Sequence, residues 1–139
     1  MLVASAIEEK APQRGGELWR LREGPVEPFA DGLRAVRTAD DAALIVGCID
    51  DVVVGYGLVR AERLHDGSRL AVLEQIYVQP EARGVGVGES IMGEVEAFAQ
   101  SQGCIGIDSL ALPGDRATKN FFETFGLVAR AITVHRKLG

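Results

Sequence analysis

The sequence predicts a single α/β domain in which a mixed, mostly antiparallel sheet is flanked by helices. Three observations support this class. Apolar runs of strand length follow one another between residues 42 and 78. An apolar stripe with helical spacing comes next, formed by Val87, Ile91, Val95 and Phe98. A further strand, helix and strand are predicted after it, within a chain of 139 residues, a usual length for one domain.

The first three strands are predicted to form a meander. They cover residues 43–49, 52–59 and 70–78, and Asp50 and Asp51 form the turn of a hairpin between the first two. On the third strand, simple alternation of side chains defines two rows. One row holds Val72, Glu74, Ile76 and Val78, and the other holds Leu73, Gln75 and Tyr77. The alternation therefore predicts that Glu74 lies in an otherwise apolar row.

The second half of the chain alternates between the two element types. A helix is expected at residues 86–102, ended by Gly103, and a strand at 105–112. This strand, helix and strand order is the crossover that parallel strands require. Asp115 is expected to cap a helix at 116–125, and a last strand is expected at 131–136.

The N-terminal region is the least readable. Residues 1–10 fit a short helix, 18–21 fit a strand, and 29–36 fit a helix with Leu33 and Val36 turned inward. We therefore divide the domain into an N-terminal segment of uncertain structure, residues 1–41, and a core, residues 42–139.

Composition argues against several classes of function. A net charge of −5 and no dense cluster of Lys and Arg give little reason to expect nucleic-acid or anionic-membrane binding. Cys48 and Cys104 lie in apolar surroundings, with no CxxC motif or His-rich partner segment. We therefore expect buried free thiols and no metal site. The start of the chain lacks the pattern of a secretory signal, and we expect a cytoplasmic protein.

The most informative segment joins the third strand to the long helix. Residues 78–88 read VQPEARGVGVG, so a glycine-rich turn precedes the helix. Backbone N–H groups of such a turn and the helix dipole attract an anion such as phosphate, and Arg83 can add a charged hydrogen bond. The glycines can also serve only a tight turn and close packing. No Gly-Lys-Ser/Thr follows, and Glu89 stands where a GxGxxG motif needs glycine, so two nucleotide-binding motifs are excluded.

The same segment resembles the signature of the GNAT acetyltransferase superfamily, a strand ending in V-x-P followed by R/Q-x-x-G-x-G/A. Val78, Pro80, Arg83, Gly86 and Gly88 occupy its positions. A second segment, NFFETFGL at 120–127, is similar to the family's N-x-Y-x-x-x-G-F. The resemblance covers residues 42–139 and does not extend to the first forty residues.

The resemblance implies acetyl-CoA as cosubstrate, bound where two parallel strands, 70–78 and 105–112, splay apart. Backbone groups of Ile76, Tyr77 and Val78 are then expected to hold the pantetheine arm. The pyrophosphate is expected on the amides of Arg83, Gly84, Val85, Gly86, Val87 and Gly88. Asn120 matches a position that contacts the cofactor arm.

Transfer of an acetyl group to an amine needs a group that accepts the amine proton. Glu74 resembles the glutamate that serves as this base in diamine acetyltransferases, and its alternative role is a strand-edge carboxylate with a salt-bridge partner. The family often protonates the leaving thiolate with a Tyr, but Phe122 stands here. Water, another residue or the solvated thiolate itself must then replace that acid.

Asp108, on the strand across the expected cleft, is our candidate for contact with an amine acceptor, and its alternative is an ordinary polar strand residue. The sequence thus predicts an N-acetyltransferase for a primary amine on a small molecule or peptide. Its rival is a non-catalytic acyl-CoA sensor, which the missing Tyr favours. The short N-terminal region leaves either an open cleft or one completed by a second subunit in a homodimer.

Overall fold

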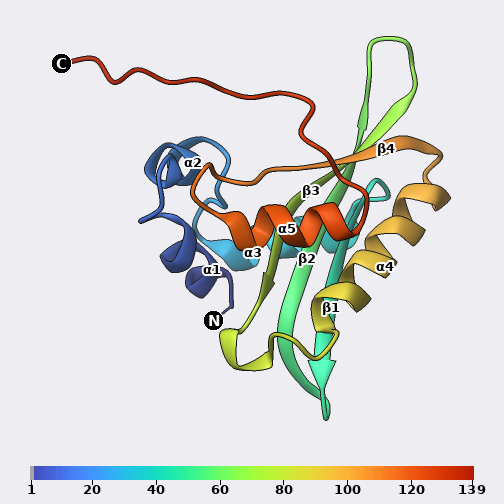
Figure 1. Ribbon diagram of the computed structural model, residues 1–139. Coiled ribbons are helices and arrows are strands. Elements are labelled where there is room, and N and C mark those ends of the chain that lie inside the picture. The colour runs from blue at the N-terminus through green and yellow to red at the C-terminus, as the bar shows by residue number, and fades with distance from the viewer. Residues whose placement is uncertain (1) are drawn as a thin grey trace.

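The computed structural model describes residues 2–139 and contains a four-stranded sheet with helices around it (Figure 1). The helices are α1 (Leu2–Lys10), α2 (Gly16–Arg22), α3 (Phe29–Thr38), α4 (Val87–Ser101) and α5 (Arg116–Thr124), with a short 3-10 turn at Pro80–Ala82. The strands are β1 (Ala42–Ile49), β2 (Val52–Arg63), β3 (Arg69–Val78) and β4 (Cys104–Ser109). Their order in the sheet, β1-β2-β3-β4, is their order in the chain. The predicted fold class is therefore confirmed.

The predicted meander is present. β1 and β2 pair antiparallel up to Ile49 opposite Val52, and the turn between them is formed by Asp50 and Asp51. Both residues have positive φ, 48° and 65°, the conformation that a two-residue hairpin turn requires and that Asp tolerates better than most residues.

The sheet changes character at β4, which pairs with β3 in parallel. The paired residues run from Arg69 opposite Cys104 to Leu73 opposite Ser109, where β4 ends. α4 provides the crossover between the two strands, as parallel pairing requires. Of the remaining residues of β3, 75–78 pair only with β2, and Glu74 has no paired residue in either neighbouring strand. The two parallel strands therefore separate halfway along β3.

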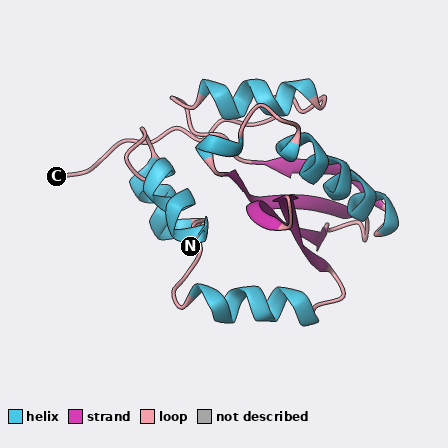
Figure 2. Ribbon diagram, turned by 90° about the horizontal axis from the view of Figure 1, so that it is seen from below, coloured by secondary structure: helices cyan, strands magenta, loops and turns pink. Residues whose placement is uncertain are grey.

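α4 packs closely on one face of the sheet because two strand glycines leave room for it. A Cβ atom at Gly47 would lie 2.5 Å from Val87 Cγ1, and one at Gly57 would lie 2.8 Å from Ile91 Cγ2. Ile91, Met92 and Val95 are consequently almost fully buried. α1 and α3 contact the sheet from its other side, and Figure 2 shows the sheet between helices.

A β-bulge overturns the predicted side-chain rows of β3. Leu58 faces Gln75 and the next residue of β2, Val59, faces Leu73, so Glu74 is the extra residue of the bulge. Alternation therefore shifts by one residue at this point. Leu73 packs into the α4-side core with Ile76 and Val78, whereas Tyr77 packs with Tyr56 on the other side. The prediction that Val72, Glu74, Ile76 and Val78 share one row is wrong.

All regular secondary structure between residues 2 and 41 is helical. The helices predicted at 1–10 and 29–36 are confirmed for the described residues as α1 and α3, but the strand predicted at 18–21 is wrong. That stretch forms α2, which buries Trp19 to 5% exposure. Four residues were too few for alternation to distinguish a strand from one helical turn.

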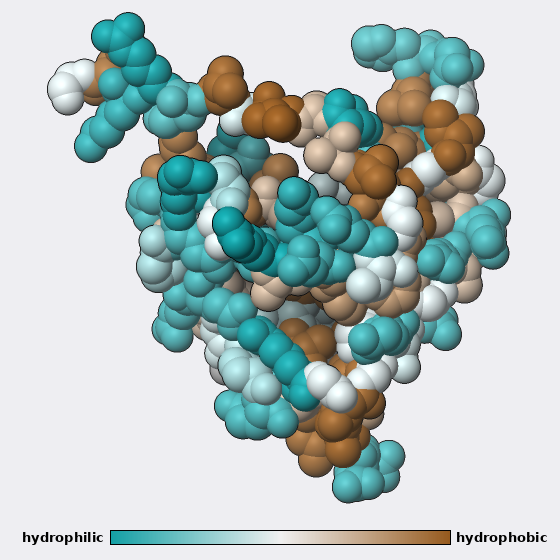
Figure 3. Space-filling model, in the orientation of Figure 1, coloured by the Kyte–Doolittle hydropathy of each residue, from teal (hydrophilic) through white to brown (hydrophobic). Residues whose placement is uncertain are grey.

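The strand predicted at 131–136 is also absent. Residues 125–139 form no helix or strand, and the tail leads away from the sheet (Figure 1). Val128, Ile132 and Val134 are at least 80% exposed, and brown and teal residues alternate along the tail in Figure 3. A strand needs a neighbouring strand with which its backbone forms hydrogen bonds, and this segment has none within residues 2–139.

The expectation of two buried thiols is wrong for Cys48 and is met only in part by Cys104. Both cysteines are free, but Cys48 is exposed while Cys104 is partly buried and packs against the core. A register shift between Gly47 and Cys48 interrupts the alternation near the end of β1, which explains why an apolar run does not bury this residue.

Candidate functional site

A cavity of about 280 Å³ lies where β3 and β4 separate. Its walls come from three parts of the chain that are far apart in sequence. One wall is the half of β3 from Glu74 to Val78, which does not pair with β4, the second is the glycine turn with α5, and the third is formed by α1 and α2. The N–H and C=O groups of a strand point toward its two neighbours in the sheet. Those on the β4 side of residues 74–78 therefore face the gap that β4 leaves.

The glycine turn is shaped by its backbone. Gly84 and Gly86 have φ of 84° and 92°, a region that side chains rarely allow, and neither has an atom within 4 Å of its Cβ position. Gly86 is the N-cap of α4 and supplies no side-chain cap to the first N–H groups of the helix. These groups, and the positive end of the dipole, therefore remain suited to an anion.

The turn residues differ in what they face. Arg83, Gly84 and Gly88 line the cavity, whereas Val87, the first residue of α4, is buried in the core and Val85 is 68% exposed. Gly88 also lets α5 approach, because a Cβ atom there would lie 3.0 Å from the Phe121 ring.

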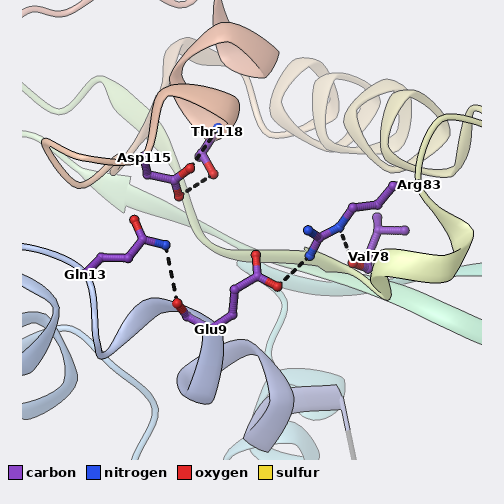
Figure 4. A network of polar contacts seen from close by, with 6 residues as sticks. All are labelled: Glu9, Gln13, Val78, Arg83, Asp115 and Thr118. Carbon is purple, nitrogen blue, oxygen red and sulfur yellow. Dashed lines mark hydrogen bonds and ion pairs between the residues drawn. The ribbon is translucent and has the colours of Figure 1, made fainter.

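Arg83 is held by protein groups on two sides (Figure 4). Its Nε donates to the carbonyl oxygen of Val78 at 2.8 Å, and its terminal nitrogen donates to Glu9 Oε2 at 2.8 Å. The guanidinium also lies 5.5 Å from the centre of the Tyr77 ring. Because the pair with Glu9 is solvent-exposed, its net stabilisation is small, and exchange of Glu9 for another anion costs little.

Glu74 reaches the cavity and also has an ion-pair partner. Its Oε1 accepts a hydrogen bond from Arg60 Nε at 3.2 Å, and both side chains are 40% exposed. The bulge places this carboxylate at the end of the β3–β4 pairing, in the mouth of the gap. The alternative role considered from the sequence, a carboxylate with a salt-bridge partner, is therefore observed, and the same side chain lines the cavity.

The two tyrosines of the chain lie on the α1 side of the sheet. The Tyr56 hydroxyl donates to Gln75 Oε1 at 2.7 Å, and burial, followed by the neighbouring Tyr77, raises the pKa of Tyr56 well above its usual value. Burial is also the main cause that raises the pKa of Tyr77, with Glu9 adding to it and Arg83 opposing it. Both phenols therefore keep their protons at neutral pH.

α5 presents one face to the cavity. Thr118, Phe121 and Phe122 lie on this face at helical spacing, and Asp115 caps the helix by accepting from the N–H of Thr118 at 3.1 Å. Phe122 is 6% exposed and belongs to the core. Asn120, which the sequence placed at the cofactor, is exposed and does not line the cavity.

Asp108 also lies outside the cavity. Both of its carboxylate oxygens accept hydrogen bonds from Arg130, with Nε at 2.9 and 3.0 Å. Its neighbour Ser109 lines the cavity instead and donates from Oγ to the carbonyl of Leu73 at 3.0 Å. Alternation along β4 turns these two adjacent side chains in different directions.

The sequence did not identify the wall formed by α1 and α2. Glu9, Lys10, Gln13 and Trp19 line the cavity from there. Lys10 Nζ lies 4.7 Å from the centre of the Trp19 ring. Burial lowers the pKa of Lys10, while Asp115 and Glu9 oppose this shift. The spacing of Val3, Ala6, Ile7 and Lys10 on one helical face was the signal available in the sequence.

Residues 2–139 show neither a metal-ion site nor a membrane-spanning helix. This stretch contains no group of three or more His, Cys, Asp or Glu residues placed to hold a metal ion. None of its helices has the length and apolar character needed to cross a membrane.

Comparison with known proteins agrees with this geometry. The model of the acetyltransferase (GNAT) family matches residues 4–127, so the likeness extends into the N-terminal region, contrary to our expectation from the sequence. The chain is 30% identical over 91 residues to an aminoglycoside N(6')-acetyltransferase type 1 of Stenotrophomonas maltophilia. This match covers 63% of the chain and 58% of that relative.

A second relative is the thialysine N-epsilon-acetyltransferase of Bos taurus, 34% identical over 74 residues, or 53% of this chain and 44% of the relative. The chain therefore spans only about half the length of these curated relatives. Among solved structures, the aminoglycoside acetyltransferase AAC(6')-Iy, in complex with the bisubstrate analogue CoA-S-monomethyl-acetylneamine, has a TM-score of 0.72 at 21% identity. That match covers 97% of this chain and 93% of the solved chain.

Proposed function

Because the chain belongs to the GNAT acetyltransferase family, we propose that it transfers an acetyl group from acetyl-CoA to a primary amine. One observation carries this proposal. The β3–β4 ladder ends at Leu73 and Ser109, and the cavity opens at that point, between unpaired strand backbone and a glycine turn at a helix N-terminus.

The residues present fit acetyl-CoA. An extended chain with amide groups, such as the pantetheine arm, adds to an open strand edge as a peptide does, and Ile76, Tyr77 and Val78 offer such an edge. The turn from Arg83 to Gly88 offers uncapped N–H groups for the pyrophosphate. A solved structure of similar fold was determined with a CoA conjugate, which supports a CoA ester as the ligand of this chain.

In this proposal Glu74 accepts the proton that the attacking amine loses. It is the acidic residue of β3, it lines the cavity, and its partial exposure leaves it accessible to water. Arg60 holds the carboxylate in place through one hydrogen bond, so its other oxygen remains available. Phe122 cannot donate a proton to the leaving sulfur, and solvent at the open cavity takes that role.

The cavity favours a cationic acceptor. Four carboxylates line it, from Glu9, Glu74, Glu89 and Asp115, against the two cations of Lys10 and Arg83, so the lining carries a net charge of −2. The two curated relatives are named for acetylation of an aminoglycoside and of thialysine, which are both amines. We therefore expect a polyamine-like or aminoglycoside-like acceptor, and we leave Asp108 out of its site because Arg130 occupies that carboxylate.

Cofactor binding is tested by calorimetric titration with CoA and acetyl-CoA. Gly86→Val removes the positive-φ glycine at the start of α4 and is expected to weaken binding at least tenfold. Gly103→Val is the matched control, because Gly103 has φ of 67°, equally open surroundings, and lies beyond the other end of the same helix. Both variants carry the same kind of backbone strain, about 1–2 kcal/mol. Equal affinity of the two variants for CoA would contradict the proposed turn.

Turnover is tested by thiol release from acetyl-CoA with a panel of amines that includes aminoglycosides, thialysine and polyamines. Glu74→Gln is expected to lower the rate with the best amine by roughly 10²–10⁴, the usual contribution of a general base. Glu62→Gln, an exposed carboxylate of β2 that does not line the cavity, should leave the rate unchanged.

A second candidate function is a non-catalytic acyl-CoA sensor, favoured by the burial of Phe122 at the position where the family often has Tyr. The two experiments together separate the candidates. Tight CoA binding without thiol release on any amine supports the sensor and rejects the transferase. Release on at least one amine rejects the sensor.

A further inference from the structure

Lys10 differs from the other two lysines of the chain in its position. It is the last residue of α1 and lines the same cavity as Glu74 and residues 75–78 of β3, which do not pair with β4. Lys119 lies on the exposed side of α5, 3.9 Å from Glu123, and Lys137 lies in the exposed C-terminal tail. The cavity is therefore lined by one lysine amine of the chain's own, together with the β3 backbone proposed to hold the pantetheine arm.

The surroundings of Lys10 disfavour its charged form. Lys10 is largely removed from water, and no carboxylate of residues 2–139 comes within 4.0 Å of its Nζ, although the face of the buried Trp19 ring offers the cation a favourable contact. The main effect on its pKa is therefore a decrease caused by burial, which Asp115 and Glu9 only partly offset. A larger neutral fraction follows than for an exposed lysine, and the neutral amine is the nucleophilic form.

We propose that the protein acetylates Lys10 of its own chain with acetyl-CoA bound in this cavity, an inference that rests on the function proposed above. In this step Lys10 Nζ attacks the thioester carbonyl carbon, so a C–N bond forms and the C–S bond breaks. The nitrogen gives up one proton, by way of Glu74 or water, and the sulfur leaves as the CoA thiol. The products are acetyl-lysine and CoA, and no oxidant or reductant is needed.

Acetylation changes the cavity in two ways. It removes the cation from the face of Trp19, and it changes the net charge of the lining from −2 to −3, because one of the two cations is lost. The modified cavity is therefore expected to bind a cationic acceptor differently from the unmodified one.

The test is to incubate the full chain with acetyl-CoA and no acceptor, and to follow acetylation of Lys10, Lys119 and Lys137 by peptide mass spectrometry. Lys10 is expected to react at least tenfold faster than either exposed lysine. Equal rates at the three lysines, or a slower rate at Lys10, would overturn the inference. A truncated thioester without the nucleotide, S-acetyl-N-acetylcysteamine, should show no more than a small part of this preference.

Transfer within one chain has a further signature. Tenfold dilution of the protein at saturating acetyl-CoA should leave the first-order rate of Lys10 acetylation unchanged, whereas a tenfold lower rate would show transfer between chains. Lys10→Arg keeps a cation over Trp19 and should abolish the thiol release that occurs without an acceptor. Lys119→Arg should retain it.

The same samples separate this inference from the proposed function. If CoA binds and amines stimulate thiol release while Lys10 stays unmodified, only the inference fails. If CoA does not bind, the proposed function fails, and any labelling of Lys10 is then equal with acetyl-CoA and the truncated thioester.

Discussion

The two halves of β3 have the same length and are continuous in sequence, yet one is packed between two strands and the other lines the cavity. Arg69–Leu73 has a partner strand on each side, and Ala71 and Leu73 are at most 2% exposed. Residues 74–78 have a partner on one side only, and they begin with an exposed carboxylate in a bulge. The difference arises because β4 ends at Ser109. A strand that loses its neighbour keeps its backbone groups available, and in this protein that is where the cavity lies.

The largest effect is expected in the fully paired half. Leu73→Ala removes a side chain that is 2% exposed beneath α4, and it should lower the free energy of unfolding by about 2–5 kcal/mol. Urea denaturation measures this loss. Leu21→Ala, at a residue that is 67% exposed, is the control and should change stability by less than about 0.5 kcal/mol. Similar losses of unfolding free energy in both variants would contradict the central place of Leu73 in the core.

The second effect is a loss of stability at high pH, caused by Tyr56 on β2, the strand that pairs with residues 75–78 of β3. Because the pKa of Tyr56 is raised by burial, its contribution to stability is complete below pH 10. Above pH 10 the unfolded chain releases the phenolic proton while the folded chain retains it, so stability falls by up to about 1.4 kcal/mol per pH unit for this group. Urea denaturation between pH 9 and pH 11 should show a shallower fall for Tyr56→Phe than for the wild type.

At neutral pH the same variant tests the hydrogen bond that holds Gln75. Tyr56→Phe removes the donor to Gln75 Oε1 and should cost about 1 kcal/mol of unfolding free energy. Tyr77→Phe is a matched control, because no hydrogen bond to its hydroxyl occurs among residues 2–139, and its cost should be smaller. A larger loss of unfolding free energy for Tyr77→Phe than for Tyr56→Phe would contradict the stabilising role of the Tyr56–Gln75 hydrogen bond.

The boundary between the two halves is secured by Ser109. Ser109→Ala removes the hydrogen bond to the Leu73 carbonyl and should cost about 0.5–1 kcal/mol, measured by denaturation. Ser90→Ala, on the exposed side of α4, should be neutral or slightly stabilising because Ala favours helix. Equal changes in unfolding free energy for the two variants would mean that the Ser109–Leu73 hydrogen bond does not stabilise the end of the β3–β4 pairing.

The smallest effect on stability is expected at the residue with the largest proposed effect on activity. Glu74→Gln breaks an ion pair whose partners are both 40% exposed, so the free energy of unfolding should change by no more than about 0.5 kcal/mol. A thermal or urea unfolding curve measures it. A loss above 2 kcal/mol would mark Glu74 as a structural residue and would weaken its assignment as the base.

Much of the core could be predicted because local patterns and tertiary packing agree there. The stripe of α4, the acidic hairpin turn and the cap at Asp115 were each identified from a few neighbouring residues. The site was predicted in part: Glu74, the β3 backbone and the turn at Arg83, Gly84 and Gly88 do line one cavity. Asn120 and Asp108 do not, because helix phase and the pairing with Arg130 turn them elsewhere.

Between residues 42 and 124 the sequence by itself determined the order of the elements, and it also determined the family and the turn that begins α4, since these depend on periodicity and on residues adjacent in the chain. Only the tertiary structure decided the bulge at Glu74, the end of the β3–β4 pairing and the wall that α1 and α2 add. It also left the apolar tail after Leu127 without a partner strand. Register and strand pairing are set by contacts between distant segments, which no local pattern specifies.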